Sequence, residues 1–461
     1  MNVLCEKMKF LRHISFILYH DLIKNDNISS VCRQYNKNQW KDKNELHAMQ
    51  HVKLHTMLIH CMQNVPYYSR IFKDRNIHVH NLHQFSILKK LPFLDKDLIR
   101  KHFGQIQSEN VPKWRIQGCS TSGSTGESLF FNADVISSVM HAASTFRNYS
   151  WCNVSPFERQ ATLWGARFDE PCNKKILDKV RAWGRPLLFL SSYQMTESMM
   201  NDYAELLCKY KPKILTSYPS PLERFAKFCM DSRVQIPSLR AIVCSAEQLT
   251  ESQRYLFQDV FRVPVFNRYG SREFGNLACE CEEHNGLHLS MERAVIEVVR
   301  DDGTDCSEGE VGEIVITDLD NKVMPFLRYR SGDMGCMGKS KCACGRGLAL
   351  LKKIDGRVFD LIYTPSGGSI SGTFWTLLLK YISKDILSFQ IRQKKIEKII
   401  IYLKMRRGIK LTSEQISRLR HKIDEVDPSL FFNIIYVDNI SLTRSGKKRF
   451  VIGLGKFPAS I

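Results

Sequence analysis

The segment Thr121-Ser122-Gly123-Ser124-Thr125-Gly126 places hydroxyl side chains and glycines in one loop, shortly before the apolar run Leu129-Phe130-Phe131. Glycines allow backbone amides to converge on an anion, and the hydroxyls supply further donors to the same oxygens. The loop lacks the Gly-Lys-Ser/Thr ending of a Walker loop. Taken alone, a loop of this composition is more often a flexible turn. The phosphate-binding interpretation therefore depends on the sequence around it.

Five further short motifs follow this loop toward the C-terminus. They are Ser245-Ala246-Glu247, Tyr269-Gly270-Ser271-Arg272-Glu273, Arg328-Tyr329-Arg330-Ser331-Gly332-Asp333, Gly356-Arg357 with Asp360, and Arg444-Ser445-Gly446-Lys447. Each motif alone is a common turn or a surface segment. In this order the set resembles the signature of adenylate-forming enzymes.

Four other segments resemble one branch of that superfamily, the phenylacetate-CoA ligase and CapK-like family. They are Asn64 to Tyr68, Leu91 to Lys96, Tyr218-Pro219-Ser220 and the run from Cys342 to Arg346. The resemblance covers nearly the whole chain.

The resemblance implies a role for each nucleotide motif. Residues 121–126 are expected to bind phosphate, and Ser245-Ala246-Glu247 is expected to contact adenine. In the next motif, Tyr269 packs near adenine and Glu273 helps to hold Mg²⁺. Asp333 is expected to bind the ribose hydroxyls.

The resemblance also implies two roles for the C-terminal quarter of the chain. Gly356-Arg357 with Asp360 resembles the hinge between a large and a small domain, and we count Arg357 among the nucleotide-binding residues. Lys447 resembles the catalytic lysine. A carboxylate that attacks the α-phosphate builds negative charge on phosphoryl oxygens, and Lys447 together with Mg²⁺ on Glu273 is suited to stabilise that charge.

Three positions depart from the family pattern. Arg272 and Arg330 stand where relatives often carry smaller or acidic residues, and Val358-Phe359 separates Arg357 from Asp360 where many members have adjacent aspartates. The hinge movement is therefore a weaker expectation than adenylation.

Cysteines and histidines cluster between and after the central motifs. Thiolates and imidazoles in two short knuckle-like segments are typical of a tetrahedral structural zinc site. The preferred ligands are Cys281, His284, Cys342 and Cys344, with Cys279, Cys336 and His288 as further candidates. The alternative is that several of these cysteines are small buried hydrophobic residues.

The composition bounds the class of protein. The chain has 461 residues with 43% hydrophobic and 25% charged side chains, which is typical of a folded protein with a large core. Fifteen cysteines without disulfide-scaffold density favour a reducing, cytoplasmic location. No stretch approaches the roughly 20 apolar residues of a membrane span, and we expect no signal peptide. A net charge of +20 fits nucleic acid, an anionic membrane or a polyanionic substrate such as ATP or coenzyme A.

Hydrophobic periodicity predicts the fold class. From Ala161 onward, short β-rich runs at 161–164, 187–190, 213–215 and 240–243 alternate with helical patterns such as 197–210. This alternation predicts a large multi-layer α/β N-terminal domain over residues 1–354, with a helical segment up to 103 and a core from about 104. The tail, 355–461, is expected to form a small, mobile α+β C-terminal domain with a helix at 373–382, strands at 389–391, 398–403 and 434–436, and a capped helix from about 413.

The predicted function is activation of a carboxylic acid with ATP through an acyl-adenylate, followed by transfer to coenzyme A. Alternatives are transfer to a carrier protein, an amine or a sugar, as the resemblance to CapK-like proteins of polysaccharide and natural-product pathways implies, and nucleotidyl transfer to a hydroxyl or phosphate. A nucleic-acid-binding zinc module is a less favoured reading, because the aromatic-basic interleaving of an RNA-binding sheet is missing. The oligomeric state is open, with a homodimer as one option.

Overall fold

The structure is a computed structural model of the chain. It describes residues 10–15, 18–23, 27–82, 85–121, 129–164, 186–192, 195–338, 341–357, 362–366, 369–370, 372–406, 408–440 and 449–454. None of the described helices is long and apolar enough to cross a membrane.

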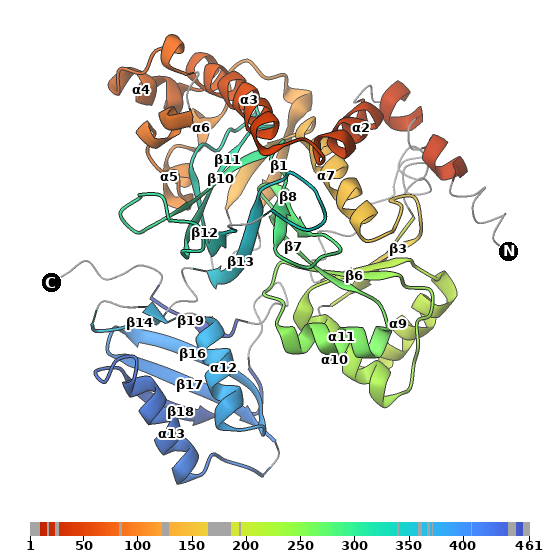
Figure 1. Ribbon diagram of the computed structural model, residues 1–461, viewed down its shortest axis with the longest axis vertical. Coiled ribbons are helices and arrows are strands. Elements are labelled where there is room, and N and C mark those ends of the chain that lie inside the picture. The colour runs from red at the N-terminus through yellow and green to blue at the C-terminus, as the bar shows by residue number, and fades with distance from the viewer. Residues whose placement is uncertain are drawn as a thin grey trace.

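The N-terminal segment is mainly helical, as predicted (Figure 1). Its longest helix, α3, begins after a capping box in which Asp42 and Glu45 satisfy each other's backbone amides. Leu54, Met57 and Leu58 of α3 are fully buried in the core that this segment shares with the large sheet. The described elements of the segment are η1 (Leu18–Ile23), α2 (Ile28–Asn38), α3 (Lys43–Asn64), α4 (Pro66–Asp74), η2 (Val79–Asn81), η3 (Phe85–Lys90), α5 (Lys96–Lys101), α6 (Phe103–Ile106) and η4 (Lys113–Arg115).

A two-stranded hairpin and an 11-stranded sheet follow, and in the large sheet the strand order is β10-β11-β12-β13-β9-β8-β7-β6-β5-β3-β4. The strands from β4 to β7 are parallel, and those from β7 to β10 pair antiparallel. The hairpin is β1 (Ile116–Ser120) with β2 (Phe130–Asp134). The strands of the sheet are β3 (Gln160–Trp164), β4 (Leu187–Ser191), β5 (Ile214–Ser217), β6 (Ala241–Ser245), β7 (Val265–Ser271), β8 (Gly275–Glu280), β9 (Leu287–Leu289), β10 (Ala294–Val299), β11 (Gly312–Asp318), β12 (Tyr329–Met337) and β13 (Leu350–Arg357).

Helices cover both faces of the parallel part of this sheet. Buried residues of α9, α10 and α11 pack with Leu215, Ile242 and Val265 on one face. Tyr149 of α7 and Cys152, the residue that caps its C-terminus, pack with Val243 and Phe266 on the other. The sheet therefore lies between two helical layers, as expected of an α/β fold. The four helices are α7 (Ser137–Trp151), α9 (Glu197–Tyr210), α10 (Pro219–Asp231) and α11 (Glu251–Phe261).

The C-terminal part forms a separate, smaller α+β unit (Figure 1). Its four-stranded sheet has the order β18-β17-β16-β19 and shares one apolar core with α12 and α13. The fold class predicted from the sequence is confirmed. The elements are β14 (Ile362–Tyr363), β15 (Ser369–Ile370), α12 (Gly372–Ile382), β16 (Ile386–Lys395), β17 (Lys398–Met405), α13 (Ser413–Asp424), β18 (Phe431–Tyr436) and β19 (Val451–Ile452).

Candidate active site

The predicted adenine-contacting motif lies at the carboxyl edge of the parallel strands, which is where open α/β sheets bind ligands. Ser245 is the last residue of β6, and its hydroxyl donates to the backbone carbonyl of Arg268 in β7 at 3.0 Å. Ala246 follows with a φ of 66°. A left-handed alanine marks a sharp turn out of the strand, and this turn directs the motif across the edge of the sheet.

Glu247 joins this turn to the start of α10. Its carboxylate accepts hydrogen bonds from the backbone amide of Ser220, at 2.9 Å, and from the Ser220 hydroxyl. Tyr218 is the N-cap residue of α10 and Pro219 is its first residue. A carboxylate at a helix N-terminus is electrostatically favourable. The Ser245 to Glu247 motif and the Tyr218 to Ser220 segment, which are separate in the sequence, are therefore in contact.

Tyr269 and Asp333 bring two further motifs together. The Tyr269 hydroxyl donates to Oδ2 of Asp333 at 2.8 Å, across 64 residues of sequence. Both side chains are buried, with exposed fractions of 7% and 9%. The backbone amide of Asp333 also donates to the Ser331 hydroxyl at 3.1 Å. The carboxylate predicted to bind ribose is thus held beside the aromatic ring predicted to pack near adenine.

Glu273 lies in the turn between β7 and β8, next to the start of the phosphate loop. The Tyr329 hydroxyl donates to Oε1 of Glu273 at 3.3 Å, and Arg272 donates to the backbone carbonyl of Ser120 at 3.4 Å. A Cβ atom on Gly270 would stand 2.2 Å from the carbonyl oxygen of Gly275. Only glycine fits this close approach of the two strands.

Several predicted residues lie outside the described part of the chain, namely Ser122, Gly123, Ser124, Thr125, Gly126, Asp360 and Lys447. The two ends of the phosphate loop are described. The Thr121 amide donates to the Leu129 carbonyl at 2.9 Å, and the Leu129 amide donates to the Thr121 hydroxyl at 3.0 Å. Arg357 is the last residue of β13 and pairs in register with Asp333, so the predicted hinge begins beside the predicted ribose clamp.

The arginines of the Arg328 to Asp333 motif have structural partners. The guanidinium of Arg328 lies 4.1 Å from the centre of the Phe93 ring, and that of Arg330 lies 4.6 Å from it. Arg330 also forms an ion pair of 3.0 Å with Glu313. The backbone of Leu94 exchanges hydrogen bonds with both arginines. Arg330, which differs from the family pattern, therefore helps to hold the Leu91 to Lys96 segment against β12.

The four aromatic residues near the strand ends that are candidates to contact the acid, namely Trp164, Tyr218, Phe266 and Tyr269, lie in different environments. Trp164 and Tyr218 form a pair with ring centres 4.0 Å apart, at the carboxyl ends of β3 and β5. Phe266 is a core residue whose ring packs 4.8 Å from that of His284. Tyr269 is bound to Asp333. Only the first two remain candidates for contact with the acid.

The cysteine and histidine cluster forms, with one ligand different from the preferred set. Cys281, His288, Cys342 and Cys344 place their ligand atoms within 4.8 Å of one another. The structure brings His288, and not His284, to this cluster. The His284 ring instead packs on Phe266, and its Nδ1 lies 3.1 Å from a carboxylate oxygen of Glu280. Cys279 and Cys336 also lie outside the cluster.

The distances within the cluster fit zinc. Sγ of Cys281 lies 3.6 Å from Sγ of Cys342, and Sγ of Cys344 lies 3.3 Å from Nε2 of His288. Tetrahedral zinc with ordinary bond lengths separates two sulfurs by about 3.8 Å and a sulfur from a nitrogen by about 3.6 Å. Nδ1 of His288 faces the Leu348 carbonyl at 3.3 Å, which leaves Nε2 for a metal. Burial lowers the pKa of His288 to about 4, so the imidazole is neutral at pH 7.

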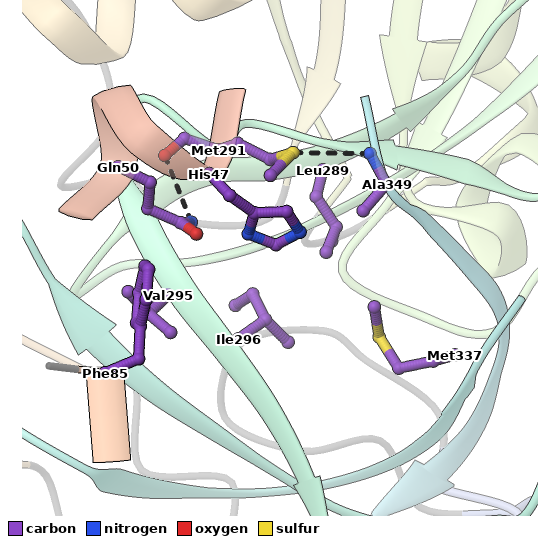
Figure 2. Close-up of a pocket in the computed structure, with 9 residues that line it drawn as sticks. All are labelled: His47, Gln50, Phe85, Leu289, Met291, Val295, Ile296, Met337 and Ala349. Atoms are coloured by element: carbon purple, nitrogen blue, oxygen red, sulfur yellow. Dashed lines mark hydrogen bonds between the residues drawn. The ribbon is translucent and has the colours of Figure 1, made fainter. Parts of the chain in front are cut away.

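A separate cavity of about 240 Å³ lies between α3 and the antiparallel strands (Figure 2). The Gln50 amide donates to the Met291 carbonyl at 3.2 Å, and the Ala349 amide lies 3.4 Å from the Met291 sulfur. The polar groups that line this cavity thus largely form their hydrogen bonds within the protein. None of the predicted nucleotide or metal residues lines it. The lining residues are His47, Gln50, Phe85, Leu289, Met291, Val295, Ile296, Met337 and Ala349.

One residue beside the site was missed by the sequence analysis. His141 of α7 lies against Gly275, where an added Cβ atom would stand 2.6 Å from its Nδ1. Gly275 directly follows the turn that carries Glu273. A lone histidine in an amphipathic helix gives no sequence signal, because its importance comes from the β-turn that packs against it.

Comparison with known proteins agrees with this geometry. The family model described as the CapK C-terminal domain matches residues 362–453. Protein CapK of Staphylococcus aureus is 25% identical over 421 residues, which cover 89% of this chain and 90% of that protein. Phenylacetate-coenzyme A ligase of Thermus thermophilus is 25% identical over 329 residues, which cover 69% of this chain and 72% of that enzyme.

The fold is also found in solved structures. 2-Hydroxyisobutyryl-CoA ligase in the postadenylation state, in complex with 2-HIB-AMP, superposes with a TM-score of 0.72 at 15% identity and covers 90% of this chain and 91% of that chain. At this identity the similarity establishes the fold. Together with the two relatives and the converging motifs, it supports the resemblance of the chain to the phenylacetate-CoA ligase and CapK-like family of adenylate-forming enzymes.

Proposed function

We propose that this protein activates a carboxylic acid with ATP and transfers the acyl group to coenzyme A. In the first step the acid carboxylate attacks the α-phosphate, which forms the acyl-adenylate and releases pyrophosphate. In the second step the coenzyme A thiolate attacks the acyl carbon, which forms the thioester and releases AMP. Cofactors of this reaction are ATP with Mg²⁺, and coenzyme A.

The observation that carries the proposal is the hydrogen bond between Tyr269 and Asp333 at the edge where β6 and β7 end. A buried carboxylate that is fixed in position presents acceptors to two adjacent ribose hydroxyls without touching the reacting phosphorus, which orients the nucleotide. The motifs on either side, Ser245 to Glu247 and Arg272-Glu273, flank this pair.

Glu273 is suited to hold Mg²⁺, since a carboxylate oxygen is a hard ligand and this residue lies half-buried beside the entry to the phosphate loop. A bound Mg²⁺ would neutralise charge on the phosphates. We propose that Lys447 stabilises the charge that develops on the α-phosphate. The Cys281, His288, Cys342 and Cys344 cluster is proposed as a structural zinc site, because four protein ligands leave no position open for chemistry.

A second acceptor class is favoured by one observation. Protein CapK matches 89% of this chain, whereas the phenylacetate-coenzyme A ligases match 67–69%, and the family model that matches the C-terminal unit is also that of CapK. The family resemblance implies that the small domain swings between the two half-reactions, so its match to CapK bears on the acceptor step. Transfer to an amine, a sugar or a carrier protein in place of coenzyme A is therefore the alternative.

Pyrophosphate exchange tests the first step independently of the acceptor. The purified protein is incubated with labelled pyrophosphate, ATP, Mg²⁺ and single aryl, fatty, hydroxy and amino acids. We expect acid-dependent exchange with at least one class. Thioester formation and AMP release on addition of coenzyme A would then assign the acceptor. Salt-dependent binding of RNA or DNA without any acid-dependent exchange would instead support a nucleic-acid module.

A further inference from the structure

Helix α7 presents an unusually polar face to the large sheet. His141, Thr145 and Asn148 are spaced by four and three residues, so they lie on one side of the helix, and the C-cap residue Cys152 follows Asn148 by four residues. The two ends of this row are located by contacts: His141 adjoins Gly275 at the start of β8, and Cys152 packs in one cluster with Phe266 of β7. The row therefore runs along the strands that carry the adenylation motifs.

Two side chains in this row have buried polar atoms without a partner among the described residues. They are Nε2 of His141 and both amide atoms of Asn148, which is only 2% exposed. A buried polar atom without a hydrogen bond destabilises the folded protein. Burial and the charge of Arg293 hold the pKa of His141 well below its usual value, so the ring is neutral and offers one donor or one acceptor at Nε2.

Arg268 adds a positive charge to the same layer. Alternate residues of a strand share a face, and Phe266, two positions earlier, packs on α7. The charge of Arg268 acts on the thiols of Cys152 and Cys279. Arg268 is half-buried, and no described residue gives it a hydrogen bond or an ion pair.

The nearby carboxylate does not neutralise Arg268. Glu280 accepts from Arg254 at 2.8 and 3.1 Å and from the backbone amide of Asn267 at 2.8 Å. It also lies 3.1 Å from Nδ1 of His284. A half-buried guanidinium with no acceptor, and two polar groups with unmet hydrogen bonds, are complementary to oxygen atoms of a ligand.

This layer lies directly behind the proposed reacting centre. Gly275 follows the turn of Glu273, and the Arg268 carbonyl accepts the hydroxyl of Ser245. Ser245 is in register with Arg268, and the contacting pair Trp164 and Tyr218 lies one residue beyond Leu163 and Ser217, the last residues in register between β3 and β5. An acid whose carboxylate meets ATP near Glu273 would therefore direct its tail toward the aromatic pair and the polar row of α7.

We propose that this layer binds the tail of the acid, and that the tail carries an oxygen acceptor, such as a hydroxyl, carbonyl or second carboxylate, which binds Arg268 with His141 and Asn148 beside it. The proposal rests on the proposed acid activation and specifies its substrate class. It excludes plain hydrocarbon tails, aryl or alkyl, as preferred substrates, because they leave these polar groups without partners.

Matched acids that differ only in the tail oxygen test the proposal. The first set is hexanoate, 6-hydroxyhexanoate and hexanedioate, and the second is phenylacetate, 4-hydroxyphenylacetate and 4-carboxyphenylacetate. The wild type, Arg268→Met and His141→Phe are compared in pyrophosphate exchange. Arg262→Met is the matched control, because this arginine is 80% exposed and outside the layer.

We expect the wild type to use an oxygen-bearing acid with a kcat/KM at least about tenfold above its hydrocarbon counterpart, the usual cost of an unmatched polar site. Arg268→Met should remove most of this preference by slowing the oxygen-bearing acid alone, and Arg262→Met should keep it. Melting temperatures of Arg268→Met and His141→Phe should equal or exceed that of the wild type, since neither variant loses a hydrogen bond. A preference for the hydrocarbon acids that Arg268→Met leaves unchanged would overturn the proposal while leaving acid activation intact.

A binding measurement distinguishes a failure of the tail-binding proposal from a failure of the proposed acid activation. If no acid supports exchange, the proposed function fails. Calorimetric titration of the same acids into the wild type and Arg268→Met still measures the affinity of the layer for the acids. Binding of oxygen-bearing acids that Arg268→Met weakens at least tenfold supports the layer. Equal binding to both proteins, or no binding at all, contradicts it.

Discussion

Asp333 has a carboxylate whose orientation is set by the protein itself. The Tyr269 hydroxyl binds one of its oxygens at 2.8 Å, and the backbone of β12 pairs Asp333 with Arg357. A hydrogen bond to a charged group contributes about 1.5–3 kcal/mol, enough to hold one rotamer. A nucleotide bound here as proposed would meet an acceptor that needs little reorganisation, which is the condition under which positioning lowers a barrier.

Lys447 is the residue expected to act on the reacting phosphate. Lys447→Ala should lower acyl-adenylate formation by about 10²–10³-fold, the usual effect of losing one charge-stabilising donor. Thioester formation from a supplied acyl-adenylate should change much less, because no phosphoryl charge develops in that step. Single-turnover assays of the two half-reactions measure both rates. An equal loss in both would show that Lys447 acts in folding or in another role.

At the scale of elements, the cysteine and histidine cluster fastens the N-terminal helices to the sheet. Arg346 follows Cys344 closely, and its guanidinium lies 5.0 Å from the ring centres of both Trp40 and Trp151. It also bonds both carboxylate oxygens of Glu282 at 2.9 Å. The segment that carries Cys342 and Cys344, two of the proposed metal ligands, thus contacts α7 and the turn before α3 directly.

Removing the metal should therefore loosen this attachment. We expect close to one zinc per chain, and chelation should lower the melting temperature. His288→Ala should lose the zinc, whereas His284→Ala should retain it, because the His284 ring faces Glu280. Metal analysis of the two variants and the wild type measures this. Absence of zinc from the wild type, with freely titratable thiols in the folded state, would end the assignment.

Local signals explain which elements were predictable. The helix predicted at 197–210 has those bounds in the structure, since Thr196 caps its start and left-handed Lys211 ends it. The choice between His284 and His288 was not predictable from spacing, because it depends on which face of β9 meets the knuckle at Cys342. Arg268 and His141 were not predictable either, since their lack of partners is visible only after α7 packs on the sheet.

At the scale of the whole molecule, the large sheet ends at Arg357 and the smaller unit begins at Ile362. The residues proposed to contact adenine and ribose lie on or beside the large sheet, and Lys447 belongs to the C-terminal segment. If Lys447 acts as proposed, adenylation requires both units. The domain boundary at 354 and 355 and the movement of the small domain stay predictions.

The central claim is that Asp333 positions ATP through its ribose hydroxyls, and nucleotide discrimination tests it most directly. Pyrophosphate exchange is measured with ATP and with 2′-deoxy-ATP, on the wild type and on Asp333→Ala. We predict that the wild type uses 2′-deoxy-ATP roughly ten- to a hundredfold less well, because a desolvated carboxylate loses a partner. Asp333→Ala should use ATP poorly and discriminate little between the two nucleotides. Equal use of both nucleotides by the wild type would contradict the account, since Asp333 would then not be the ribose clamp.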